Sequence, residues 1–216
     1  MELWSDYVES FGFGSNLNLQ MPSVNNGFIP SSSYYNQYYG INRWKFSNVY
    51  SLSIGQGELL VTPLQMANLA SIISNRGYYY EPNLIMEVDG IKKNNFRLNK
   101  INIDRKHFDY IADAMEEVVE LGSGRRGYMK RLELCGKTST VQNPHGDDHS
   151  GFIGFAPKSD PKIAIASYIE NAGWGGRAAV SISSLIAEYY IYNETKRNWL
   201  EEYVLKGDFI DEEDYQ

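Results

Sequence analysis

The residues with the clearest chemical potential form one short run, Lys137-Thr138-Ser139-Thr140, at the end of an expected β-strand over residues 132–137. A lysine ammonium offers positive charge to a carboxylate, and neighbouring hydroxyl groups add hydrogen bonds to it. A strand edge also presents backbone N–H groups that can hold an acyl oxygen or an extended peptide. The run therefore predicts a site for an acyl or peptide compound that carries a carboxylate, although a lone Lys-Thr pair on a strand is more often ordinary surface.

Acyl chemistry at such a site needs a nucleophile, and the sequence offers one weak candidate. The only Ser-x-x-Lys string, Ser159 to Lys162, lies in a predicted hairpin turn and contains Pro161. A serine that is activated by lysine needs both side chains within one turn at a helix start, so that the amine reaches the hydroxyl. A Ser-x-Asn string, Ser23 to Asn25, lies in a predicted long loop. We therefore expect no nucleophile in this chain.

Other polar and aromatic groups give weaker indications. His145 and His149 flank two aspartates, but Pro144 and Gly146 predict a loop, so a loop-shaping role is favoured over a metal site. Trp174 stands between glycines, where a lid over a site and a packed turn remain equally open. Clusters of tyrosine at 34–39 and 78–80 could stack on sugars, although packing among themselves is favoured.

The predicted elements describe an α+β protein with an antiparallel sheet and packed helices. Thr62-Pro63 and Gln65 form a strong helix start, because the threonine and glutamine can cap each other's backbone. Residues 15–50 are predicted to be a long irregular loop. The predicted helices cover residues 3–11, 62–77, 104–121 and 176–192, and the predicted strands cover 132–137, 151–156 and 162–169. We divide the chain into a domain over 1–192 and an acidic C-terminal tail over 193–216, whose last acidic residues, from Asp208 on, are expected to be mobile.

Composition excludes several classes of protein. The 216 residues carry a net charge of −7, which disfavours nucleic acid as a partner. The single cysteine, Cys135, cannot form an internal disulfide and is expected to be a buried core residue. No stretch has the length of a membrane span, and the N-terminus has no signal-peptide pattern.

The ordered set of short motifs resembles the penicillin-binding proteins, most closely the elongation-type penicillin-binding protein 2. Lys137-Thr138-Ser139 is similar to the Lys-Thr-Gly motif that this family shares with serine β-lactamases. Further segments match the family in the same order along residues 5–192; they are Phe11 to Gly14, Gly27 to Pro30, Ser53 to Gly57, Val61 to Ala67, Gln142 to His149, Phe152 to Pro157 and Glu170 to Gly176.

This resemblance implies the C-terminal part of a transpeptidase domain, hence a partial penicillin-binding-protein/β-lactamase-like fold. In the family, a serine attacks the D-alanyl-D-alanine end of a peptidoglycan stem peptide, and the acyl group passes to a neighbouring stem. Lys137 and Thr138 would act as catalytic and carboxylate-binding residues. Ser139, Thr140 and Trp174 would contact the stem peptide or a β-lactam, and the Thr140 N–H would belong to the oxyanion hole. Ser139 replaces the family's glycine, so it either crowds the ligand or tunes the site, and the replacement is not read as inactivation.

The resemblance also implies what lies outside the sequence. In the family, the Ser-x-x-Lys and Ser-x-Asn motifs precede the segment that corresponds to Phe11 to Gly14. In this chain only ten residues stand before that segment. A truncated, inactive chain is therefore expected, whose intact protein would be a periplasmic enzyme anchored in the inner membrane. No metal or organic cofactor is expected, and a glycan-polymerase membrane partner is implied by analogy. A D,D-carboxypeptidase, a β-lactamase, or a non-catalytic β-lactam-sensing or scaffold module of the same fold remain as alternatives.

Overall fold

The computed structural model describes residues 1–21, 23–92 and 96–210. The chain divides into two compact units, one made of residues 1–65 and 79–101 and the other of residues 66–78 and 102–216. The predicted α+β class is confirmed, because helices accompany small antiparallel sheets. Among the described residues, no helix combines the length and the apolar character that crossing a bilayer requires.

The first unit consists of short helices joined by long connections. It contains α1 (Glu2–Ser10), α2 (Ser32–Tyr39), α3 (Phe46–Val49) and the 3-10 helix η1 (Tyr50–Ile54). Two small sheets follow in the chain, β1 (Tyr78–Tyr80) with β4 (Leu98–Lys100) and β2 (Glu87–Val88) with β3 (Ile91–Lys92).

The prediction of one irregular loop over residues 15–50 is wrong for its second half, which contains α2 and α3. Helix α2 begins because the Ser31 hydroxyl accepts a hydrogen bond from the Tyr34 N–H at 3.2 Å, which satisfies a donor at the helix start. Tyr35, on the inner face of this helix, is fully buried. Its packing stabilises a helix whose residues have low helix propensity.

Helix α4 (Pro63–Ser74) begins as predicted. The Thr62 hydroxyl accepts from the Gln65 N–H at 3.3 Å, and the Gln65 side chain accepts from the Thr62 N–H at 2.9 Å. This reciprocal pair is the capping box that the sequence indicated. The buried Gln65 amide also donates to the carbonyls of Ser15 and Asn26, each at 2.8 Å, and thereby fixes the preceding connection.

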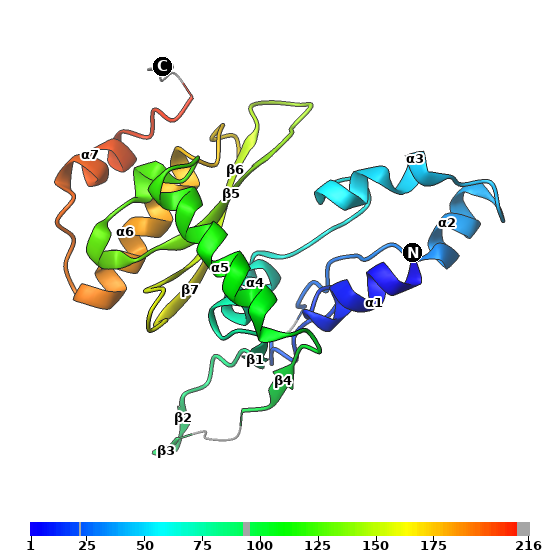
Figure 1. The fold of residues 1–216 in the computed structure, drawn as a ribbon, viewed down its shortest axis with the longest axis horizontal. Helices are drawn as coiled ribbons and strands as arrows, with labels where there is room; N and C mark the ends of the chain where they lie inside the picture. The colour runs from blue at the N-terminus through cyan, green and yellow to red at the C-terminus, as the bar shows by residue number, and fades with distance from the viewer. Residues whose placement is uncertain (22, 93–95, 211–216) are drawn as a thin grey trace. The chain divides into compact units, whose positions relative to one another are not determined.

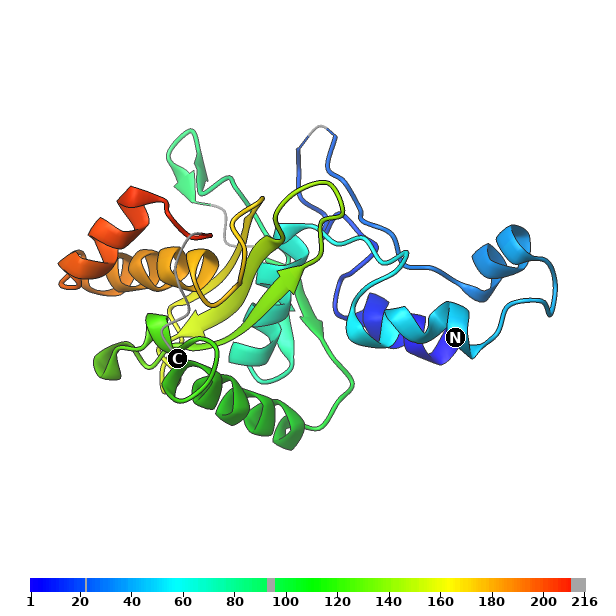
Figure 2. The ribbon, with the colours of Figure 1, turned by 90° about the horizontal axis from the view of Figure 1, so that it is seen from above.

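A three-stranded antiparallel sheet forms the centre of the second unit. Its strands lie in the order β5 (Cys135–Val141), β6 (His149–Ala156) and β7 (Ile163–Ile169). Helix α6 (Ala178–Tyr192) packs on one face, and the part of α4 from Met66 onward lies on the other (Figures 1 and 2). Helix α5 (Arg105–Glu120) packs against β5, and it buries Phe108, Met115 and Val119, whereas Ile111 is 44% exposed.

The first strand of this sheet does not have the predicted bounds. Leu132 belongs to the 3-10 turn η3 (Lys130–Leu132), and Glu133 adopts a left-handed backbone with φ of 47°. Because extended backbone cannot run through a left-handed residue, the strand starts at Cys135. It continues to Val141, so the Lys137–Thr140 run lies inside the strand and not after its end.

Part of the segment that was assigned to the acidic tail forms a helix. Helix α7 (Asn198–Lys206) follows α6 in the second unit, and both Arg197 and Leu200 are buried. The Arg197 guanidinium donates to the Glu188 carboxylate at 2.9 Å, to the Gly127 carbonyl and to Ser184, so charge pairing and apolar packing hold this segment. The acidic residues from 211 on lie outside the described residues, and a domain boundary at 192/193 stays a prediction.

Candidate functional site

The candidate residues 137–140 lie on strand β5, where successive side chains point to opposite faces of the sheet. Lys137 and Ser139 share one face of the sheet, and Thr138 and Thr140 share the other. Lys137, Ser139 and Thr140 are exposed, while Thr138 is only 8% exposed. Because β5 is the first strand in the order β5-β6-β7, its outer edge pairs with no other described strand. The run therefore combines a cation, hydroxyls and a free strand edge.

The Thr138 hydroxyl is held by a residue that the sequence analysis did not single out. Its Oγ1 atom lies 2.6 Å from Oγ of Ser123, which belongs to the turn after α5. Ser123 was hidden in the sequence because Gly122 and Gly124 on either side read only as a helix stop. The Ser123 contact fixes the Thr138 rotamer, so the threonine hydroxyl is oriented before any ligand arrives.

Gly151 explains how a serine fits at position 139. Ser139 and Gly151 are paired across β5 and β6, and a Cβ atom at Gly151 would lie 2.1 Å from Ser139 Oγ. The serine hydroxyl thus occupies the space above Gly151 and leans toward β6, away from the free edge of β5. This geometry supports the interpretation that Ser139 leaves the edge accessible.

The structure brings the Trp174 loop against the same strand. The Gly175 N–H donates to Thr140 Oγ1 at 3.3 Å, and the buried Ser150 hydroxyl donates to the Trp174 carbonyl at 3.0 Å. The approach is close because Gly175 has no side chain, and a Cβ there would lie 2.2 Å from the Ser139 carbonyl oxygen. The Trp174 ring is 61% exposed, and its centroid lies 5.6 Å from the Arg177 guanidinium carbon. The backbone of the loop is therefore fixed, while the indole remains open to solvent.

The β5–β6 connection is tied to this loop as well. The Gly173 N–H donates to the Asp148 carbonyl at 2.8 Å, and the Asn143 amide donates to the Asn171 side chain at 2.8 Å. His149 Nδ1 accepts from the Asn171 N–H at 3.0 Å, which is the loop-shaping role that the sequence favoured. No group of three or more His, Cys, Asp or Glu side chains in the described chain is arranged to hold a metal ion.

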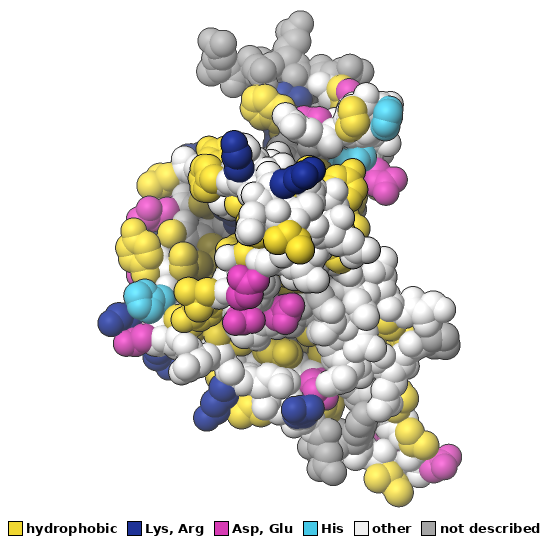
Figure 3. All heavy atoms as spheres, turned by 90° about the vertical axis from the view of Figure 1, so that its right-hand side faces the viewer, with side chains coloured by type: hydrophobic (Ala, Val, Ile, Leu, Met, Phe, Trp, Pro, Cys, Tyr) yellow, Lys and Arg dark blue, Asp and Glu magenta, His cyan; other side chains and the backbone are white. Residues whose placement is uncertain are grey.

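Lys137 does not form a salt bridge with any carboxylate of the described chain. Its ammonium instead donates to the Thr138 carbonyl at 2.6 Å. Lys and Arg side chains on the face drawn in Figure 3 lie scattered and, among the residues described there, form no single patch. Lys137 thus keeps a weakly satisfied positive charge that a ligand carboxylate can take over.

The weak nucleophile candidate, Ser159, lies in the turn between β6 and β7 and not at a helix start. The N–H and hydroxyl of Ser159 both donate to the Glu133 carboxylate, at 3.0 and 2.5 Å. The Lys162 ammonium lies 2.5 Å from Asp160. The Ser159 hydroxyl and the Lys162 ammonium are thus paired with different carboxylates, and the two residues do not open a helix. That Ser159 is not the nucleophile stays a prediction.

Cys135 offers no alternative nucleophile. Its side chain is fully buried, as predicted, in the first position of β5. Burial raises the pKa of the thiol to about 12, with a further contribution from Glu116. Since the thiolate is the reactive form, this cysteine is inert at neutral pH.

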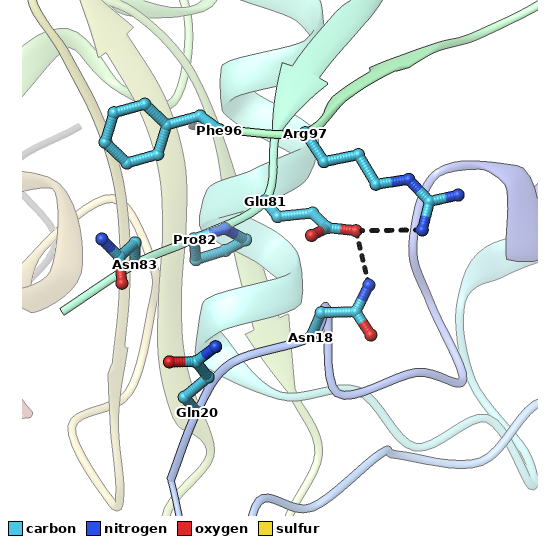
Figure 4. Close-up of a pocket in the computed structure, with 7 residues that line it drawn as sticks. All are labelled: Asn18, Gln20, Glu81, Pro82, Asn83, Phe96 and Arg97. Carbon is cyan, nitrogen blue, oxygen red and sulfur yellow. Dashed lines mark hydrogen bonds and ion pairs between the residues drawn. The ribbon is translucent and has the colours of Figure 1, made fainter. Parts of the chain in front are cut away.

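A small hollow in the first unit lies apart from these motifs. It is lined by Asn18, Glu81 and Arg97, among others, and Figure 4 shows the Glu81 carboxylate between the other two. Glu81 accepts from the Asn18 amide at 2.5 Å and lies 3.7 Å from an Arg97 nitrogen. The negative charge of Glu81 is therefore already compensated within the hollow. The cluster links the segment around Asn18 to the segments around Glu81 and Arg97.

The site therefore consists of an edge strand that carries Lys137 and Thr138, a C-terminal helix behind the sheet, and the Trp174 loop against the strand. This arrangement and the motif on the strand point to a transpeptidase of the penicillin-binding class. Residues 1–188 match the family described as penicillin binding protein transpeptidase domain, and the chain belongs to that family. It is 29% identical over 212 residues to the peptidoglycan D,D-transpeptidase MrdA of Acinetobacter baumannii, covering 89% of this chain and 31% of that protein. It is 26% identical over 210 residues to MrdA of Haemophilus influenzae, covering 87% of this chain and 32% of that protein.

Solved structures of penicillin-binding proteins share the fold of this chain. PBP2 of Pseudomonas aeruginosa, determined in complex with WCK 5153, aligns with a TM-score of 0.79 at 25% identity, covering 92% of this chain and 44% of that one. PBP2 of Helicobacter pylori, in complex with MreC, aligns with a TM-score of 0.71 at 22% identity, covering 89% and 36%. The expected resemblance to penicillin-binding protein 2 is confirmed. The chain spans about a third of the length of the curated relatives.

Proposed function

We propose that this chain forms the substrate-carboxylate and oxyanion side of a peptidoglycan D,D-transpeptidase of the elongation type, which also binds β-lactams. The observation that carries the proposal is the free edge of β5, with Lys137 exposed and Thr138 held by Ser123. A peptide that ends in a carboxylate can lie along this edge as an added strand, because the edge offers backbone hydrogen bonds.

Each residue of the run has a distinct proposed role. Lys137 and Thr138 bind the carboxylate and organise proton transfer, since a cation and an oriented hydroxyl stabilise negative charge. Ser139 and Thr140 line the bound chain, and the exposed Trp174 ring covers it. The N–H groups of alternate residues point to the same strand edge, so the Thr140 N–H shares an edge with the Thr138 carbonyl that Lys137 contacts. That N–H is the proposed oxyanion donor, and such donors are worth about 3 kcal/mol in a transition state.

The serine nucleophile is proposed to come from outside these 216 residues, since Ser159 lies in a turn and not at a helix start that would bring a lysine amine to its hydroxyl. A periplasmic site on a membrane-anchored protein is part of the proposal, and the similarity to the bacterial MrdA proteins supports it. A glycan polymerase is the proposed partner. It is supported by a fold match, with a TM-score of 0.75, to a structure described as coordinating polymerization and crosslinking in a peptidoglycan synthase complex.

Covalent labelling by a fluorescent penicillin tests the proposal. The 216-residue chain alone should give no label that survives denaturing electrophoresis. A fusion that places this chain behind the nucleophile-bearing part of the A. baumannii relative should be labelled. In that fusion, Lys137→Ala should slow labelling about 10- to 100-fold, the amount expected for a hydrogen bond to a charged group. A fusion that folds by circular dichroism yet is not labelled would contradict the proposal, and so would a label on the chain alone.

A further inference from the structure

Helix α2 carries an ordered array of tyrosine rings that the proposed function does not use. Its eight residues, Ser32–Tyr39, contain four tyrosines. Tyr34 and Tyr38 stack nearly parallel, with centroids 6.1 Å apart and an interplanar angle of 15°, and Tyr35 and Tyr39 do the same at 5.9 Å and 15°. Residues four apart lie above one another on a helix, so the rings form two rows along its axis.

The two rows interlock and are anchored from below. Tyr34 meets Tyr35 edge to face at 5.4 Å, and Tyr38 meets Tyr39 in the same way at 4.8 Å. The buried Tyr35 hydroxyl donates to the Glu58 carboxylate at 2.7 Å, and its ring lies 5.5 Å from that of Trp44. Burial raises the pKa of Tyr35, with the Glu58 contact as the second cause, so this donor keeps its proton. The anchored Tyr35 ring therefore fixes the orientation of the Tyr34 and Tyr39 rings that pack against it.

One ring of each row is exposed. Tyr38 is 70% exposed and Tyr39 is 36% exposed. Rings that packed only to build a core would be covered, whereas here the buried Tyr35 ring already supplies the core contacts. A prearranged aromatic surface loses little conformational entropy when a ligand binds, which favours recognition.

Charge narrows the class of ligand. Residues 32–39 contain no charged side chain, and the amide of Gln37 and the hydroxyl of Ser33 are exposed beside the rings. Nucleic acids and anionic lipid surfaces are bound mainly through lysine and arginine, which this helix lacks. A sugar ring presents an apolar C–H face and a rim of hydroxyl and amide groups, and it matches a tyrosine face that is bordered by neutral hydrogen-bonding groups.

We propose that the tyrosine array of α2, with Tyr38 as its exposed centre, is a binding platform for a neutral N-acetylhexosamine chain. Resting on the proposed function, this chain is the glycan strand of peptidoglycan, whose stem peptides the β5 edge would receive. The platform would hold the polymer and not the reacting peptide, so it adds affinity for the glycan and takes no part in acyl transfer.

Binding of a tetramer of β-1,4-linked N-acetylglucosamine to the full 216-residue chain tests the platform. The titration is followed by NMR or calorimetry, and cosedimentation with purified peptidoglycan sacculi provides a second readout. Tyr38→Ala should weaken binding about 3- to 10-fold, as expected for one aromatic stacking contact, and Tyr38→Phe should retain most of it. Tyr110→Ala is the matched control, because Tyr110 on α5 is 74% exposed and should change binding less than about twofold.

The outcomes separate this inference from the transpeptidase proposal. No saturable binding of the tetramer by the wild-type chain would overturn the platform, as would an equal loss with Tyr38→Ala and Tyr110→Ala. Tyr38-dependent binding to anionic phospholipid vesicles in place of sacculi would also overturn it, in favour of a membrane surface. Sugar binding without penicillin labelling of the fusion would keep the platform and reject the transpeptidase proposal, because the sugar assay needs no serine.

Discussion

Replacing Gly175 with alanine is expected to separate the Trp174 loop from strand β5. A Cβ atom at this position would lie 2.2 Å from the Ser139 carbonyl oxygen, 2.6 Å from that of Gly151 and 2.9 Å from the Ser139 nitrogen. All three are backbone atoms of paired strands, so no rotamer change can relieve the overlap. The loop must therefore withdraw from the sheet.

The free-energy cost follows from the contacts that are lost. Introducing a methyl group into a filled space costs about 1–3 kcal/mol. Withdrawal also breaks the bond from the Gly175 N–H to Thr140 and the bond from Ser150 to the Trp174 carbonyl, each worth about 1 kcal/mol. We expect Gly175→Ala to lower the free energy of unfolding by about 3–5 kcal/mol.

Urea unfolding measures this cost, and hydrogen exchange locates it. Protection of the amides in residues 171–177 should fall in the variant, since the Gly175 N–H loses its acceptor. Gly207→Ala is the control, because a Cβ there would have no atom within 4 Å among the described residues, its chain neighbours aside, and its φ of +72° costs only about 1 kcal/mol. If Gly175→Ala destabilises no more than Gly207→Ala, or if the loop keeps its protection, the described packing of loop on strand is refuted.

Three further predictions concern buried or paired groups. Arg197→Met leaves the buried Glu188 carboxylate without its main cation and should cost about 3–5 kcal/mol in urea unfolding; a loss below about 1 kcal/mol would contradict the ion pair. Ser159→Ala should cost about 0.5–1 kcal/mol at pH 7. Hydrogen bonds from Ser159 lower the pKa of Glu133 below 4.5, so this difference should persist above that value and vanish as pH falls through the lowered pKa. The Cys135 thiol should react with a disulfide reagent at pH 8 only after unfolding, because burial raises its pKa to about 12; rapid reaction of the native chain would contradict its burial.

Local sequence signals were sufficient for several elements. Helix α4 begins where Thr62 and Gln65 form a capping box, and α5 is capped by Asp104, whose carboxylate accepts from the Lys106 N–H at 3.0 Å. The β6–β7 hairpin follows from the turn residues between Pro157 and Pro161. These features depend on contacts within a few residues, so the sequence alone determines them.

Elements that depend on distant partners were missed or displaced. Helix α2 forms because Tyr35 is buried and bonds to Glu58, a residue 23 positions away. Helix α7 was read as an acidic tail because its anchor is the contact of Arg197 with Glu188, which no local pattern indicates. Propensity and charge describe only the segment itself, and tertiary packing overrides them.

The candidate site shows the same division. The sequence by itself determined that Lys137, Thr138, Ser139 and Thr140 stand together and match a transpeptidase motif, although it ended the strand at Lys137. Only the tertiary structure decided that Ser123 orients Thr138, that Gly151 makes room for Ser139, and that Gly175 brings the Trp174 loop onto the strand. The physical reason is that the reactive side chains of a strand come from consecutive residues, so a motif in the sequence shows them. Their orientation depends on residues that are distant in the sequence, and the close approach of those segments requires a glycine at the point of contact.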